Sequence, residues 1–170
     1  LCTLKACGNI GIVEHGRLVH DQLIRNEFDW DPELKNALID MYAKCRSLSE
    51  ADKVFKTVNM REVVAWNSLI GGYSQQGQSE NVLGLFRDMQ KEGLMPDKVT
   101  FSFTLKACAS METLNHGRLL HDKIMKIGLD FDVVVGSAIV DMYCKCKSLK
   151  DGRKVFEGIR GRNLVSWNAI

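Results

Sequence analysis

The chain repeats itself at a spacing of 101 residues, and no insertion or deletion interrupts the register. The segment TLKAC at 3–7 returns at 104–108, and HGRLVHD at 15–21 returns as HGRLLHD at 116–122. A long unit that recurs in register is typical of repeat proteins, whose copies stack and bury their apolar faces against one another. The repeat therefore constrains the fold more strongly than any other feature of the sequence.

Apolar residues recur with the period of an α-helix inside each long unit. Four of them lie at i, i+3, i+4 and i+7 on one helical face: Trp66, Leu69, Ile70 and Tyr73. A second helical pattern follows after a tight turn and ends before Pro96, and no segment alternates with period two for long. The sequence thus predicts an all-α protein, an α-solenoid of stacked helix-turn-helix repeats.

Composition indicates the partner only weakly. A hydrophobic content of 45% is typical of a globular protein, and no apolar run has the length of a membrane span, so we expect no membrane association. The net charge of +2 weakly favours an acidic partner. Because Leu1 is not a start residue, we expect the chain to be a segment of a longer protein.

The cysteines and histidines do not form a pattern typical of catalysis or metal binding. Cys7 and Cys108 are equivalent in the repeat, and we expect the six cysteines to be mainly buried, reduced thiols. Histidines five residues apart, as in HGRLVH, do not share a helical face, which favours packing or surface polarity over metal ligation. Since the sequence has no nucleophile constellation, glycine-rich phosphate loop or deaminase signature, we expect no enzymatic activity, no metal and no cofactor.

Breaks before the helical patterns divide the chain into units of 31 or 35 residues. Four complete units are expected: 32–62, 63–97, 98–132 and 133–163. Three consecutive units of 35, 35 and 31 residues account for the spacing of 101. A tetratricopeptide array would keep a uniform period of about 34 residues, so it fits poorly.

This alternation resembles the PLS subclass of plant pentatricopeptide repeat (PPR) proteins, the type found in organellar RNA-editing factors. VVAWNSLIGGYSQQGQSENVLGLFRDMQKEGLMPD at 63–97 is similar to a P motif, 98–132 to an L motif and 133–163 to an S motif. The same register assigns the rest: a partial L motif at 1–31, an S motif at 32–62 and the start of a P motif at 164–170. The resemblance implies a right-handed α-solenoid.

The resemblance also implies binding of single-stranded RNA with one base per repeat. In the family, the fifth and last residues of a motif contact the base edge, and the second residue packs against the base faces. In the P motif these residues are Asn67, Asp97 and Val64. The combination of Asn with Asp favours uracil over cytosine.

The other complete motifs supply two further sets of contacts: Ser137, Asn163 and Val134 in 133–163, and Ser102, Asp132 and Val99 in 98–132. The first set resembles an adenine reader. The second would suggest guanine in a P motif, but L motifs follow this code poorly, so we give it less weight.

Two motifs have incomplete or unusual sets. In 32–62, Asn36 pairs with Glu62, and Glu33 replaces the apolar stacking residue, so no base is assigned there. The motif that opens at residue 164 supplies Asn168 and Val165 without a last residue.

Each of these residues also has an ordinary structural interpretation. An Asn or Ser early in a helix is often a cap or solvated, and an Asp after a Pro, as at Asp97, is common in turns. Recurrence at equivalent positions favours base contact instead. Lys44 and Lys145, which are repeat equivalents, either contact RNA phosphates or form a solvated face.

Two functions from different classes follow. The first is an RNA-recognition module that guides C-to-U editing or other transcript processing in the mitochondrion or chloroplast, while catalysis comes from another domain or partner. The alternative is a protein-interaction solenoid with little RNA affinity, which binds multiple organellar RNA editing factor (MORF) proteins through its L motifs. Because both ends of the chain cut through motifs, we also expect end-to-end self-association.

Overall fold

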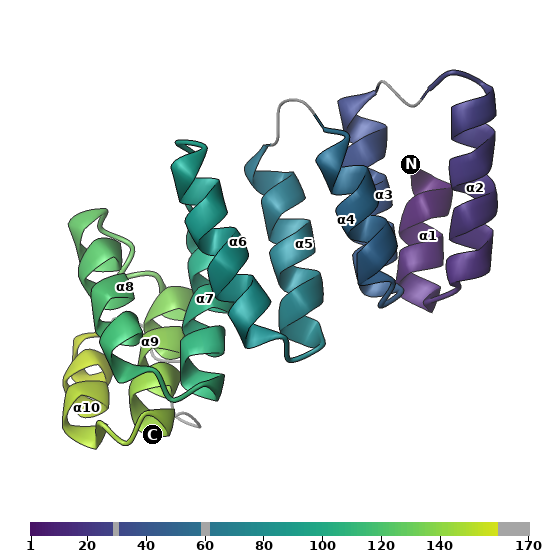
Figure 1. Ribbon diagram of the computed structural model, residues 1–170. Coiled ribbons are helices and arrows are strands. Elements are labelled where there is room, and N and C mark those ends of the chain that lie inside the picture. The colour runs from purple at the N-terminus through teal and green to yellow at the C-terminus, as the bar shows by residue number, and fades with distance from the viewer. Residues whose placement is uncertain (29–30, 59–61, 160–170) are drawn as a thin grey trace. The chain divides into compact units, whose positions relative to one another are not determined.

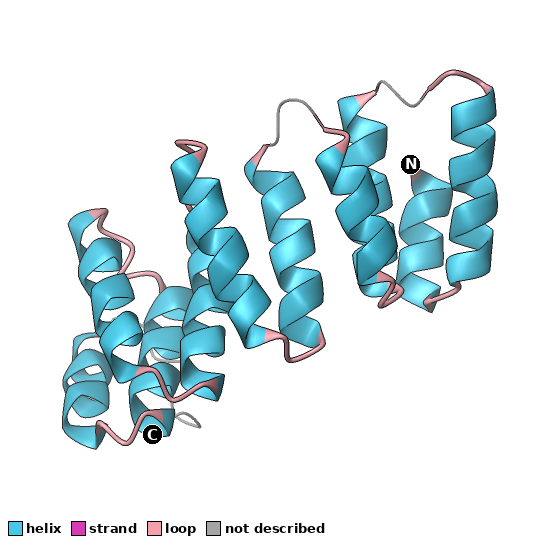
Figure 2. Cartoon of the chain, viewed as in Figure 1, coloured by secondary structure: helices cyan, strands magenta, loops and turns pink. Residues whose placement is uncertain are grey.

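The computed structural model describes residues 1–28, 31–58 and 62–159, and within these ranges only turns interrupt the helices (Figure 2). Ten α-helices follow one another in these ranges: α1 (Cys2–Ile10), α2 (Val13–Arg25), α3 (Pro32–Lys44), α4 (Leu48–Lys56), α5 (Val63–Gln75), α6 (Ser79–Lys91), α7 (Lys98–Ser110), α8 (Leu114–Lys126), α9 (Val133–Lys145) and α10 (Leu149–Gly158). No helix within the described ranges is long and apolar enough to cross a membrane. The predicted all-α fold is confirmed.

The helices divide into two compact units, Leu1–Gln76 and Gly77–Ile170 (Figure 1). In the first unit, α3 packs between α1 and α5, and the helices α2 and α4 lie against this layer. In the second unit, α7 and α9 form the corresponding layer, against which α6, α8 and α10 pack. Within each unit, neighbouring helices thus bury their apolar faces against one another, both within a hairpin and between hairpins.

The first helices of the motifs are α1, α3, α5, α7 and α9, and the second helices are those that pack against them. In each unit, the core lies between the layer of first helices and the second helices. In the first unit, fully buried side chains come from neighbouring first helices: Ile39 and Met41 of α3, and Leu69 and Ile70 of α5. In the second unit, the core joins four helices: Phe86 of α6, Phe101 and Leu105 of α7, Ile124 of α8, and Ile139 and Met142 of α9. Burying each such side chain contributes about 1.5–3 kcal/mol, so the stacked layers account for most of the stabilisation.

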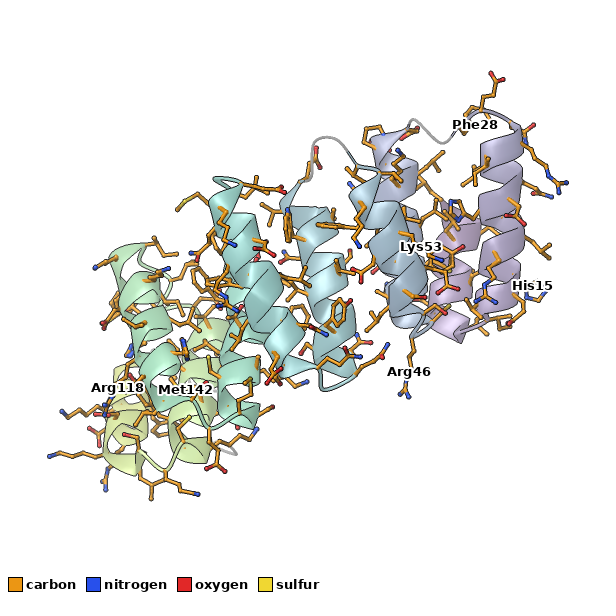
Figure 3. All side chains as sticks on the ribbon, viewed as in Figure 1. His15, Phe28, Arg46, Lys53, Arg118 and Met142 are labelled. Atoms are coloured by element: carbon orange, nitrogen blue, oxygen red, sulfur yellow. The ribbon has the colours of Figure 1, made fainter. Side chains whose placement is uncertain are left out.

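Two glycines of the repeated HGRL segment let helices of neighbouring motifs approach closely. A Cβ added at Gly16 would lie 2.3 Å from Sδ of Met41, and one added at Gly117 would lie 2.2 Å from Sδ of Met142. Both methionines are fully buried, and the flexible thioether of each fills the space beside its glycine. Figure 3 shows Met142 within the second unit. Both copies of the 101-residue repeat therefore have the same glycine–methionine contact, as well as the same pattern of apolar and polar residues.

The same neighbouring helices share a histidine–tyrosine contact in both units. Nδ1 of His20 lies 3.0 Å from the hydroxyl of Tyr42, and Nδ1 of His121 lies 3.0 Å from that of Tyr143. The two rings of each pair meet edge to face. Burial lowers the pKa of both histidines and so favours the neutral imidazole. The predicted packing role of these two histidines is confirmed.

The cysteines are less buried than the sequence predicted. All six are free thiols, but only Cys7 and Cys108 are buried, whereas Cys2 is exposed and the other three are partly exposed. The reason is position: Cys45 and Cys146 directly follow α3 and α9, so they lie at helix ends and not within the core. Their Sγ atoms approach the carbonyl oxygens of Cys7 and Cys108 at 3.6 and 3.8 Å.

We expect Gly72→Ala to destabilise the first unit. The added Cβ would lie 2.8 Å from Cβ of Ala43 and 2.9 Å from Cδ2 of Leu48. Because Ala43 has no rotamer that relieves the overlap, the helices must move apart. The free energy of unfolding should fall by about 1–3 kcal/mol, measured by urea denaturation followed by circular dichroism.

Gly84→Ala is the matched control. It adds the same methyl group in the middle of α6, where no atom lies within 4 Å of the new Cβ. The better helix propensity of alanine should leave stability unchanged or raise it by up to about 1 kcal/mol. Equal effects of the two substitutions would contradict the close contact at Gly72.

Candidate nucleic-acid interface

An exposed valine stands in the first turn of three successive first helices. Val64 of α5, Val99 of α7 and Val134 of α9 have exposed fractions of 59%, 40% and 59%. A single exposed apolar side chain is ordinary, but recurrence at one motif position makes these valines candidates for ligand contact. In the second unit, Val99 and Val134 lie on helices that pack side by side. At the corresponding position of α3, the charged Glu33 is exposed.

The serines at the fifth position of two motifs donate their hydroxyl groups to their own helices. Oγ of Ser102 lies 2.8 Å from the carbonyl oxygen of Lys98, and Oγ of Ser137 lies 2.7 Å from that of Val133. Ser137 is moreover buried, with an exposed fraction of 4%. Both hydroxyls retain acceptor capacity, but Ser137 presents little of it to a ligand.

The asparagines at the same position are partly exposed. Asn67 lies on the first unit's α5, and Asn36 on α3. Within the part of the chain that the structure describes, Oδ1 of Asn36 is buried and has no hydrogen-bond partner. An unpaired buried acceptor costs about 1–3 kcal/mol, so Asn36 gains from any rearrangement that brings a donor to this atom.

The last residues of two motifs are N-caps of the next helix. Oδ1 of Asp97 accepts the backbone N–H groups of Val99 and Thr100 at 3.0 and 2.9 Å. Oδ1 of Asp132 accepts two N–H groups at the start of α9, at 2.9 and 3.2 Å. Glu62, which precedes α5, makes no such side-chain bond. Both aspartates therefore have a structural role as N-caps, and any base contact comes in addition to capping.

Candidate residues around α7 lie near one another in the second unit. Nζ of Lys98 is 3.9 Å from Oδ2 of Asp132, which places Asp132 beside the first turn of α7. The same turn carries Val99, and Ser102 follows one turn later. The predicted set of 98–132 thus shares one end of one helix layer.

The predicted set of the P motif is divided between the two units. Asn67 belongs to the first unit and Asp97 to the second. Three candidates lie outside the described residues: Asn163, Val165 and Asn168.

The two lysines predicted to meet phosphates each form an ion pair with an aspartate one turn earlier. Nζ of Lys44 lies 2.6 Å from Oδ2 of Asp40, and Nζ of Lys145 lies 2.8 Å from Oδ2 of Asp141. Our sequence analysis missed these aspartates, although the spacing D-M-Y-x-K occurs in both copies. The lysines therefore lie on a partly neutralised surface.

Our sequence analysis named Asp97 and Asp132 as candidate base contacts and not as caps, and it did not name Asp31, which is also an N-cap. Oδ1 of Asp31 accepts the N–H of Glu33 at 2.8 Å and so begins α3. The repeat register is the signal that identifies it, because Asp31 lies 101 residues before Asp132.

A second recurring surface lies on the second helices and their exits. It exposes large apolar side chains in both units: Leu18, Ile24 and Phe28 in the first, and Leu119, Met125 and Phe131 in the second. A hollow of about 260 Å³ beside α2 is lined by Ile24, Phe28 and Lys53. Its counterpart beside α8, of about 270 Å³, is lined by Met125, Phe131 and Lys154. A hollow with apolar lining residues and a lysine therefore occurs in both units, and Asp130 also lines the one beside α8.

Comparison with known families identifies the repeat. The model of the PPR repeat family matches residues 61–110, and the PPR repeat model matches 35–61 and 137–164. These matches cover more than half of the chain. The chain belongs to the pentatricopeptide repeat (PPR) family.

Three pentatricopeptide repeat-containing proteins of Arabidopsis thaliana are similar to almost the whole PPR chain. At4g38010 is 37% identical over 171 residues, which cover 100% of this chain and 31% of that protein. At1g06140, mitochondrial, is 36% identical with the same coverage. At1g11290, chloroplastic, is 37% identical over 167 residues, covering 98% of this chain and 21% of that protein. The chain spans less than a third of the length of these relatives.

The PPR chain is also similar to a solved structure, that of PPR10 in complex with an 18-nt psaJ RNA element. The TM-score is 0.80 at 20% sequence identity, and the similarity covers 94% of this chain and 24% of PPR10. This similarity confirms the predicted fold class, an α-solenoid of helical hairpins.

We expect Asp97→Ala to destabilise the PPR chain through the loss of an N-cap. The N–H groups of Val99 and Thr100 would lose their acceptor, and such losses typically cost about 1 kcal/mol. Thermal and urea unfolding would measure the change.

Asp97→Asn is the matched variant, because asparagine caps helices about as well as aspartate. It should retain most of the stability that Asp97→Ala loses. Equal losses in both variants would show that the charge near the start of the helix matters more than the hydrogen bonds.

Proposed function

We propose that this PPR chain is a sequence-specific module for single-stranded RNA in which each motif contacts one base. The observation that carries the proposal is the series of exposed valines, Val64, Val99 and Val134, beside polar side chains. Unstacked bases have apolar faces and polar edges, and such a surface is complementary to them. The complex of PPR10 with an RNA element supports RNA as the partner of the shared fold.

Base selection in the P motif rests on Asn67 and Asp97. The amide of Asn67 both donates and accepts, whereas the carboxylate of Asp97 only accepts. Uracil offers an N–H donor flanked by carbonyl acceptors, so this pair is complementary to its edge. Because Asp97 already caps α7, its position at the start of the helix is fixed before RNA binds.

The remaining motifs contribute unequally in this proposal. Ser102 with Asp132 forms the next set, since both lie at the same end of α7 and α9. Ser137 with Asn163 contributes less, because the Ser137 hydroxyl is buried and donated within its helix. In 32–62 the exposed carboxylate of Glu33 is a poor surface for a base face, so Asn36 and Glu62 act without a stacking partner.

We further propose that the chain belongs to the PLS subclass and guides organellar C-to-U editing or other transcript processing. Relatives whose names include "mitochondrial" or "chloroplastic" support a location in one of these organelles. The role of the chain is recognition, and the reaction is carried out by another domain or partner. Among the described residues, no group of three or more metal-ligating side chains occurs.

We expect Asn67→Ala to remove the preference for uracil at one RNA position. The test is a fluorescence-anisotropy titration of labelled oligonucleotides that differ only at that position. The discrimination lost should correspond to about 1–3 kcal/mol, the worth of a good bidentate base contact. Asp97→Asn, which keeps the cap, should also change the preference.

Circular dichroism of each variant controls for folding. Binding that stays identical for all bases after both substitutions, with folding intact, would contradict base readout by these residues. A uniform loss of affinity for every sequence would assign them a positioning role only.

The recurring apolar surface supports a second candidate function, docking of a MORF-type protein on the L motifs. Exposed Met125 and Phe131 line a hollow with Lys154 at its rim, and Ile24 and Phe28 repeat the arrangement in the first unit. Large exposed apolar side chains around a hollow are typical of protein interfaces.

We expect Phe131→Ala to weaken binding of a purified MORF-type protein about tenfold or more, because buried aromatic anchors dominate interfaces. RNA affinity should remain unchanged. Isothermal titration calorimetry measures the first and fluorescence anisotropy the second. The control is Leu149→Ala, which removes another large exposed apolar side chain at the start of α10. Unchanged affinity in Phe131→Ala would contradict docking at this hollow.

A further inference from the structure

Two aspartates form ion pairs with the lysines that are candidates for contact with RNA phosphates. Asp40 pairs with Lys44 on α3, and Asp141 pairs with Lys145 on α9, at 2.6 and 2.8 Å. One pair lies in each compact unit, so the same geometry forms in two separate settings. In the first unit the lysine stem also lies against α1, where a Cβ added at Gly8 would be 3.3 Å from Cδ of Lys44.

Folding alone does not explain these ion pairs. The side chains of Asp40 and Asp141 are both 34% exposed, and those of Lys44 and Lys145 are 40% and 56% exposed. Exposed pairs four residues apart on a helix stabilise proteins only slightly. Each aspartate lies one turn from the C-terminal end of its helix, where the helix dipole does not favour a negative charge.

We propose that Asp40 and Asp141 attenuate RNA binding by neutralising Lys44 and Lys145. This inference rests on the proposed RNA-binding function. A phosphate that approaches either lysine must displace a carboxylate that is already hydrogen-bonded to it, and the displaced carboxylate repels the phosphate. The two motifs therefore bind the backbone weakly, and a larger share of the binding energy comes from base contacts.

Attenuation of this kind limits binding to RNA of other sequences. Phosphate contacts add affinity for every sequence alike, so strong contacts would raise the affinity for wrong RNA by the same factor as the affinity for the target. With the lysines neutralised, differences between bases account for a larger part of the total affinity.

The test uses Asp40→Asn, Asp141→Asn and the double variant of the full 170-residue chain, with a labelled single-stranded RNA titrated at several salt concentrations. Asparagine keeps the size of the side chain and removes its charge. Each substitution should tighten binding about two- to fivefold, the range expected for an exposed ion pair. The plot of log affinity against log salt should steepen by about 0.7 for each lysine released. The ratio of affinities for matched and mismatched RNA should stay constant, because a phosphate contact does not depend on sequence.

Asp88→Asn is the matched control. Asp88 forms a similar exposed pair with Lys91, at 2.8 Å, on the second helix α6. The substitution Asp88→Asn raises the net charge by the same one unit, but away from the layer of first helices. RNA affinity should therefore change less than in Asp40→Asn. A gain in Asp88→Asn as large as that in Asp40→Asn would overturn the inference, because it would reduce the effect to net charge.

Two further variants separate this inference from the function on which it rests. Lys44→Gln should weaken binding, and Asp40→Asn combined with Lys44→Gln should lose the gain of Asp40→Asn. RNA binding that weakens in Lys44→Gln but does not change in Asp40→Asn would overturn attenuation and leave RNA recognition standing. Absence of RNA binding by every variant would overturn both.

Discussion

The stacking of first helices is the contact on which the rest of the structure depends. A single helical hairpin of this size cannot cover its own apolar face, so α3 packs between α1 and α5, and α7 packs against α9. Small residues set how closely these layers approach, as at Gly72, where no side chain fits between α5 and Ala43. The same packing fixes which residues of each first helix remain outside. The exposure of Val99 and Val134 on neighbouring helices is a consequence of this core packing.

The fold could be predicted well from the sequence, because both the repeat and the helical period are visible in the spacing of the apolar residues. Helices begin at Pro32, Val63, Lys98 and Val133, the residues at which the expected units begin. Three of these four starts follow an aspartate that caps the helix, and such a cap is readable from sequence. The division into P, L and S motifs remains a prediction.

Side-chain roles were harder to predict, because they depend on contacts in the folded structure that the helical period of the sequence does not identify. Ser137 occupies a predicted base-contacting position, yet packing buries it and its hydroxyl bonds its own helix. Cys45 and Cys146 belong to the apolar pattern, yet they follow the ends of their helices and approach carbonyl groups of another helix. The partners of Lys44 and Lys145 lie on the same helix, and the spacing of the repeated motif already contained them. A search for charges four residues apart finds such pairs, whereas burial at a helix interface needs the tertiary structure.

The capping aspartates limit how such an array can change its target. Asp97 and Asp132 close a motif and at the same time start the next helix. A residue at this position that contacts a base must also serve as the N-cap of the next helix if the cap is to be kept. Asp, Asn, Ser, Thr and Gly are the residues that cap helices well. In the proposed RNA-binding role, substitutions at this position that keep the cap are therefore confined to a few small residues, whereas Glu62 precedes α5 without a side-chain cap. A substitution chosen for its hydrogen-bonding pattern alone would loosen the helix on which the following motif is built.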